Sequence, residues 1–127
     1  MRGTTVRRWH FDKLVTEALD ELPRRFRRRL RNIAVVVESE PSQELLEDMG
    51  LWPHGTLLGL YQGVPLPQRG FNYGNVLPDR IIIFQKPIEA MCRTREEIKE
   101  AVKDTVKHEI GHYFGLDDER LEELMEG

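Results

Sequence analysis

The segment HEIGHYFGLDDER, residues 108–120, brings two histidines, a glutamate and several further carboxylates close together in the sequence. On a helix, His108 and His112 are separated by about one turn, so their imidazoles face the same side and can converge on one zinc ion. Glu109 follows the first histidine and lies on the adjoining side of the helix, within reach of a water molecule at the ion without being a ligand itself. The spacing therefore predicts a metal site that activates water.

A third protein ligand has to follow His112, because catalytic zinc sites combine three protein ligands with one open position. Gly115 supplies a backbone that can take positive φ and turn the chain back. Asp118 is the carboxylate that this turn returns to the ion. Its neighbours Asp117 and Glu119 offer the same chemistry, and Asp118 could instead hold a ligand histidine by a hydrogen bond. The predicted donor set is two imidazoles and one carboxylate, with Asp118 favoured.

The helix that must carry both histidines is the clearest element of the sequence. Thr94 and Glu97 have the spacing of a capping box, which predicts a helix that starts there and continues to about Phe114. Glu109 falls on the inward face of this helix, where a buried carboxylate without a partner would be costly. Either the helix borders a polar cavity or function places Glu109 there. The apolar residues of the inward face include Ile98, Val102, Val106, Ile110 and Tyr113.

The remaining elements are indicated by periodicity and by turn residues. Helices are expected over residues 9–22, then through Leu30, and over 42–50, 86–92 and 117–126, and strands over 33–39, 56–62 and 80–85. Residues 63–79, rich in Gly, Pro and Asn, have no periodic pattern and predict a long loop. The order predicts an α+β fold, with a small three- to four-stranded mixed sheet packed with helices and the site helix near the C-terminus.

Length and composition predict a single domain over residues 1–127. The N-terminal segment has no apolar run that reads as a secretory signal, and no stretch approaches the length of a membrane span. Cys92 is the single cysteine, so no intramolecular disulfide is available. We expect a cytoplasmic protein without a membrane partner.

The charges are unevenly distributed along the chain. Residues 1–31 hold ten Lys and Arg against four Asp and Glu, whereas residues 104–127 hold two against eight. The basic run RRFRRRLR contains Phe26 and Leu30 four residues apart, which is typical of a helix with a solvated basic face. We therefore expect no nucleic-acid partner.

The motif His108-Glu109-x-x-His112-x-x-Gly115-x-x-Asp118 resembles the metzincin form of the zincin signature, with Asp in place of the usual third His. Snapalysin-type peptidases are similar in using Asp there. Nearly the whole chain resembles a family of small bacterial proteins with a minimal zincin-like fold, described as zinc metallopeptidases. The segments that carry this resemblance are AVVVESEPS, LLGLYQGVPLPQRG, LPDRIIIFQ and DDERLEEL. The resemblance implies a zinc site at this motif and leaves the substrate unassigned.

These observations predict a zinc-dependent metallopeptidase. Zinc-activated water would attack a peptide bond with Glu109 as general base, and the partner would be a peptide or protein substrate. The alternative is a zincin scaffold kept for binding a metal or a protein, without catalysis. Nine residues follow Asp118, with Met125 in an expected helix, so there is no room for a metzincin-like methionine turn.

Several further side chains can be assigned expected roles. Tyr73 and Tyr113 are candidates to stabilise an oxyanion, although packing is the stronger expectation for both. A peptide could pair with the edge of the sheet along residues 56–62 or 80–85. Trp9 and Trp52 are expected to anchor packing.

Overall fold

The computed structural model describes residues 4–63 and 79–113 and, for residues 112 and 113, the backbone. Nine elements follow one another within these ranges. They are α1 (Arg8–Asp20), α2 (Arg24–Arg29), the 3-10 turn η1 (Leu30–Asn32), β1 (Ala34–Glu38), α3 (Gln43–Asp48), β2 (Gly59–Gln62), β3 (Arg80–Phe84), α4 (Gln85–Ala90) and α5 (Arg95–Tyr113).

The described strands form one mixed sheet in the order β1-β3-β2. β3 pairs in parallel with β1 and antiparallel with β2. The predicted α+β fold with a small mixed sheet is confirmed. β3 is the central strand, so the suggestion that a substrate could pair with residues 80–85 is wrong. The edges of this sheet are β1 and β2.

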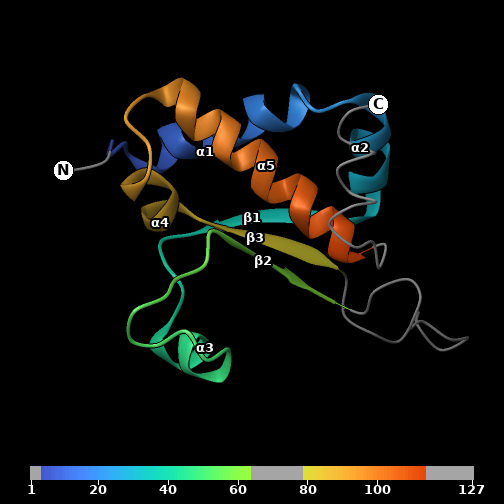
Figure 1. Cartoon of the computed structure of the whole chain (residues 1–127). Coiled ribbons are helices and arrows are strands. Elements are labelled where there is room, and N and C mark those ends of the chain that lie inside the picture. The colour runs from blue at the N-terminus through green and yellow to red at the C-terminus, as the bar shows by residue number, and fades with distance from the viewer. Residues whose placement is uncertain (1–3, 64–78, 114–127) are drawn as a thin grey trace, which may run out of the picture.

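Helices α1 and α5 cover one face of the sheet, and α3 lies on the opposite side (Figure 1). Ile81 and Ile83 of β3 point toward α1 and α5 and are fully buried. Ile82 and Phe84 alternate to the other face and are buried as well. Both faces of β3 are therefore covered, which explains why the strand is almost entirely apolar. The core between helices and sheet also contains Phe11, Leu14, Ala18, Ile98, Val102, Val106 and Ile110.

The start of α5 is fixed by the predicted cap. The Thr94 hydroxyl accepts a hydrogen bond from the Glu97 amide at 3.1 Å, and the Glu97 carboxylate accepts one from the Arg93 amide at 2.9 Å. The first contact satisfies an amide that the first turn of a helix leaves without an intrahelical partner, and the second ties the chain just before the cap to the helix. The predicted turn at Gly115, the helix over 117–126 and the central part of the long loop lie outside the described residues.

The shorter elements follow the predictions with small shifts. β2 begins at Gly59 rather than at residue 56, although the Phe84 amide still donates to the Leu58 carbonyl. Phe26 is buried while most of the arginines around it are exposed, which agrees with the predicted basic face of α2. Within the described residues, no helix is long and apolar enough to cross a membrane.

The two tryptophans do not behave as expected. Trp9 is 66% exposed and Trp52 is 46% exposed, so the prediction that they anchor packing is wrong. Trp9 stacks on the ring of His10, with ring centroids 5.2 Å apart. Trp9 lies in the first turn of α1, and Trp52 lies in the connection between α3 and β2, outside any helix or strand.

Candidate metal centre

The described part of the predicted site lies where α5 packs against β2, and Gly59 permits this close packing. A Cβ atom on Gly59 would lie 2.5 Å from the Thr105 methyl group and 3.0 Å from the Ile82 carbonyl oxygen. The first distance is too short for a side chain and the second is tight, so α5 packs directly against the strand backbone. The glycine is needed for close approach, as glycines within strands often are.

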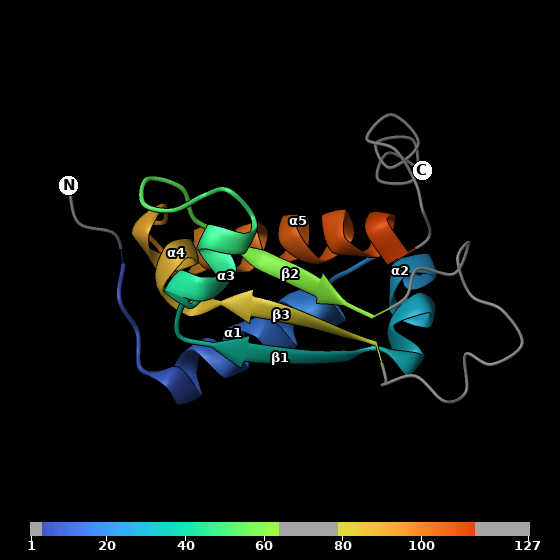
Figure 2. The same ribbon diagram turned by 90° about the horizontal axis from the view of Figure 1, so that it is seen from below.

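This packing places Glu109 at the outer edge of the sheet. Phe84 bonds to Leu58, and in an antiparallel ladder the bonded residues alternate, so the N–H and C=O of Gly59 and Tyr61 point away from β3. The amide of Tyr61 donates to Oε1 of Glu109 at 2.7 Å. Figure 2 shows α5 running alongside β2, beyond that edge of the sheet. The carboxylate therefore pairs an edge amide that none of the described strands reaches.

Glu109 is 8% exposed, which confirms its predicted place on the inward side of the helix. The sequence left two explanations open for such a carboxylate, and the structure provides a cavity beside it, with polar side chains of α5 on one wall and Leu57 and Leu58 on the other. The cavity has a volume of about 320 Å³ and lies between residues 56–59 and α5. From the helix, Asp104, Thr105, His108 and Glu109 line it. The side chain of a candidate ligand and that of the candidate base thus line the same space.

His108 is exposed on α5 one turn after Asp104. The helix continues through Tyr113, so the backbone of His112 lies one turn beyond His108 on the same side. Asp118, Asp117, Glu119 and the oxyanion candidate Tyr73 lie outside the described residues. Of the predicted donors, the structure therefore places one imidazole at the cavity and the backbone of the second.

A catalytic zinc site needs three protein ligands and one open position. Among the side chains that the structure describes, no group of three or more His, Cys, Asp or Glu could hold a metal ion. The part that is described fits, because the exposed His108 imidazole can serve as one donor, and the buried Glu109 carboxylate lies on the adjoining side of the helix, where a base rather than a ligand is expected. The prediction that His108, His112 and Asp118 are ligands stays a prediction.

An ion-pair cluster fixes α5 to α1 at the solvent side. Lys103 and Lys99 contact the two carboxylate oxygens of Glu21 at 2.6 and 2.8 Å. Hydrogen bonds from Lys103 and from Lys99 lower the pKa of Glu21 from 4.5 to about 2, and the same contacts raise the pKa of both lysines. The cluster orients α5 without taking part in the cavity.

Two features of the site were not found from the sequence. The role of Gly59 had a signal, since a glycine inside the otherwise apolar stretch TLLGLYQ often marks a close backbone approach. The partner of Glu109 had none, because a backbone amide carries no mark in the sequence.

Comparisons with known proteins assign the chain to a family and support its fold. The family described as zincin-like metallopeptidase matches residues 30–127, and the chain belongs to this family. Among solved structures, the chain is similar to a conserved hypothetical protein from Thermo thermophilus. The TM-score is 0.51 and the identity 22%, over 87% of this chain and 100% of the other. At that identity, the likeness supports the fold alone. Comparison with curated proteins gives no significant match.

Proposed function

We propose that the protein is a zinc-dependent metallopeptidase with Glu109 as its general base. Membership of the zincin-like metallopeptidase family supports this assignment at the level of the class. The observation that carries the proposal is the placement of Glu109, a buried carboxylate held at the wall of a cavity that His108 also lines. A carboxylate in this position suits proton transfer better than packing.

His108, His112 and Asp118 would hold the ion, with Asp117 and Glu119 as the alternative carboxylates. When bound, zinc supplies a Lewis acid that polarises the substrate carbonyl and lowers the pKa of a water molecule. Glu109 would accept a proton from the attacking water and would deliver a proton to the leaving amine. The Tyr61 amide holds Oε1 of the carboxylate, which restricts its rotation.

The substrate would lie between the edge of β2 and α5. The backbone groups of Gly59 point away from β3 at this edge, and residues 56–59 form one wall of the cavity. An extended peptide can add to such an edge by main-chain hydrogen bonds. This position places a peptide bond next to the side chains of His108 and Glu109.

The test compares Glu109→Gln with the wild type. Glutamine keeps an oxygen that can accept the Tyr61 amide, so the fold should be retained, whereas the proton acceptor is lost. With zinc supplied, we expect cleavage of a peptide library to fall by about 10² to 10⁴. Glu96→Gln, an exposed site on the same helix, is the matched control and should cleave normally. Wild-type activity in Glu109→Gln would refute the assigned base.

Metal content separates catalysis from binding. Zinc measured after dialysis should fall below stoichiometry in His108→Ala and remain in Glu109→Gln. If His108→Ala keeps stoichiometric zinc, the proposed site is wrong. If the wild type holds zinc through His108 but cleaves nothing in the library, the alternative of a metal- or protein-binding scaffold is favoured over the peptidase.

A further inference from the structure

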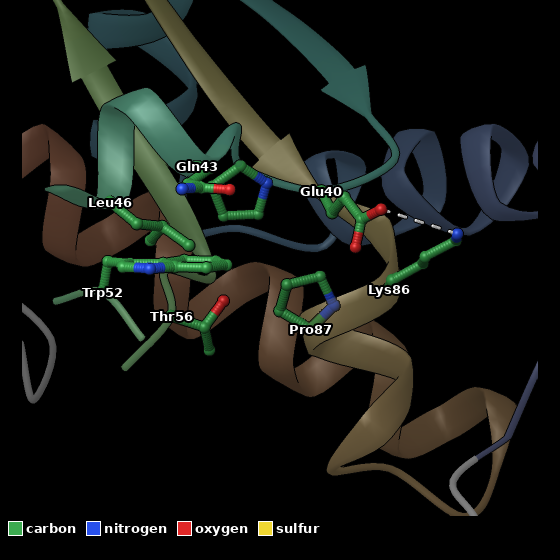
Figure 3. Close-up of a pocket in the computed structure, with 8 residues that line it drawn as sticks. Glu40, Gln43, Leu46, Trp52, Thr56, Lys86 and Pro87 are labelled. Carbon is green, nitrogen blue, oxygen red and sulfur yellow. Dashed lines mark ion pairs between the residues drawn. The ribbon is translucent and has the colours of Figure 1, made fainter. Parts of the chain in front are cut away.

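A second cavity lies next to the candidate site, on the side of the sheet near α3. Its volume is about 510 Å³. Three segments distant in the sequence form its walls: the connection from β1 into α3, the connection from α3 to β2, and the first turn of α4. In Figure 3, the indole of Trp52 reaches in from one side, and Pro87 faces it from α4 with Glu40 and Lys86 beside it.

The lining is apolar in the middle and charged at the rim. Trp52, Leu46 and Pro87 supply the apolar surface. Oε1 of Glu40 and Nζ of Lys86 lie 3.8 Å apart in an exposed ion pair. The rim therefore carries one negative and one positive charge, with no net charge. A charged side chain therefore finds no net attraction here, whereas a flat apolar group can stack on the indole.

The backbone of Trp52 is held by a hydrogen bond to the end of α3, although its side chain is only partly buried. Its own amide donates to the Leu46 carbonyl at 3.2 Å, at the end of α3. Gly50, with φ of 72°, allows the chain to leave the helix there. Trp52 is 46% exposed and lines the cavity together with Leu46 and Pro87, so these three residues present one apolar surface to solvent.

The two cavities adjoin at Thr56, which lines both of them. Between Thr56 and Gly59 the chain advances three residues, or at most about 10 Å. A peptide that follows this wall from Gly59 would reach the second cavity after about three residues. The second cavity is therefore a continuation of the candidate site.

We propose that this cavity, the Trp52 pocket, is a specificity pocket that binds an aromatic side chain of the polypeptide substrate. The inference rests on the proposed function, because it takes the substrate to lie along the edge of β2. The indole stacks with the aromatic ring, Leu46 and Pro87 exclude water from it, and the Glu40 and Lys86 pair admits the peptide backbone at the rim.

The experiment uses Trp52 as its own reporter. The chain has two tryptophans, so Trp9→Phe leaves Trp52 as the single one, and Glu109→Gln prevents turnover. This zinc-supplied double variant is titrated with short alanine-based peptides in which one phenylalanine is moved through every position, and with the peptide lacking phenylalanine. We expect a saturable change of fluorescence for one phenylalanine position, with affinity at least about tenfold above that of the all-alanine peptide.

The reciprocal measurement uses an enzyme with Glu109 intact. Trp52→Ala should lose the preference for phenylalanine at that position through a rise in KM with kcat retained, whereas Trp52→Phe should keep most of it. Thermal unfolding followed by circular dichroism checks that both variants fold. If phenylalanine at no position binds more tightly than alanine, the pocket assignment fails, whether or not peptides are cleaved. If phenylalanine binds at Trp52 but the wild type cleaves no peptide, the pocket stands and the peptidase proposal fails.

Discussion

Replacing Gly59 by alanine tests the contact that brings α5 onto the edge of β2. The new Cβ would lie 2.5 Å from the Thr105 methyl and 3.0 Å from the Ile82 carbonyl oxygen. Neither neighbour can give way easily, because Thr105 is 9% exposed and its hydroxyl donates to the Ala101 carbonyl at 2.7 Å. The helix and the strand would have to move apart.

Two opposing effects set the size of the change in stability. Overpacking a closely packed site costs about 1 to 3 kcal/mol. Alanine in place of glycine also reduces the entropy of the unfolded chain, which stabilises the protein by about 0.4 to 1 kcal/mol. Because overpacking outweighs the entropy gain, we expect Gly59→Ala to lower the free energy of unfolding by roughly 1 to 2 kcal/mol. For a chain of this size, Tm should fall by roughly 3 to 10 °C.

Urea denaturation of a double-mutant cycle measures this coupling. Thr105→Ser removes the methyl group that the new Cβ would meet and keeps the hydroxyl, at a cost of about 0.8 kcal/mol for the buried carbon. The double variant should then be more stable than the sum of the single effects by about 1 kcal/mol, and only partly rescued because the Ile82 carbonyl remains. Two results would refute this account: the effects of the two substitutions on the free energy of unfolding add within about 0.3 kcal/mol, or Gly59→Ala is as stable as the wild type. Either result would show that the contact between residue 59 and Thr105 does not set the distance between α5 and β2.

Two further predictions concern the anchoring of other elements. Because Lys103 and Lys99 lower the pKa of Glu21 from 4.5 to about 2, its contribution to stability is fully present above pH 4.5 and is lost as the pH falls toward 2. The difference in urea midpoint between the wild type and Glu21→Gln should close over this range, and a difference that does not depend on pH would refute the cluster. Glu89 is buried and accepts the Val6 amide at 2.8 Å, so Glu89→Ala should cost about 1 to 3 kcal/mol. Hydrogen exchange at Val6 should also become faster than in Glu89→Gln, which retains an acceptor, and equal exchange rates would show that the contact does not hold the N-terminal segment.

Regular elements were predictable because their signals are local. The Thr94 cap, the helical spacing of Ile98 and Val102 and the β-branched run of β3 each depend on residues close in sequence, and each is confirmed. The burial of Glu109 also followed from its position on the helix.

Contacts that depend on the three-dimensional arrangement were not predictable. The order β1-β3-β2 makes the last of the described strands the central one, and neither strand composition nor spacing distinguishes an edge of this sheet from its centre. The exposure of Trp52 had the same cause, because three segments distant in sequence meet around it. A bulky residue in a turn could equally have been buried by any of them.

Glu109 meets two demands that normally conflict. As the partner of the Tyr61 amide it has to stay in place, and as the proposed base it would have to take a proton from water and deliver one to the leaving amine. A carboxylate can do both, since its two oxygens offer about four acceptor sites and one amide does not use up that capacity. The same bond also pairs an amide at the strand edge, where an open backbone would attract other strands. The loss of activity in Glu109→Gln with retained stability would separate the two demands, because glutamine can satisfy only the first.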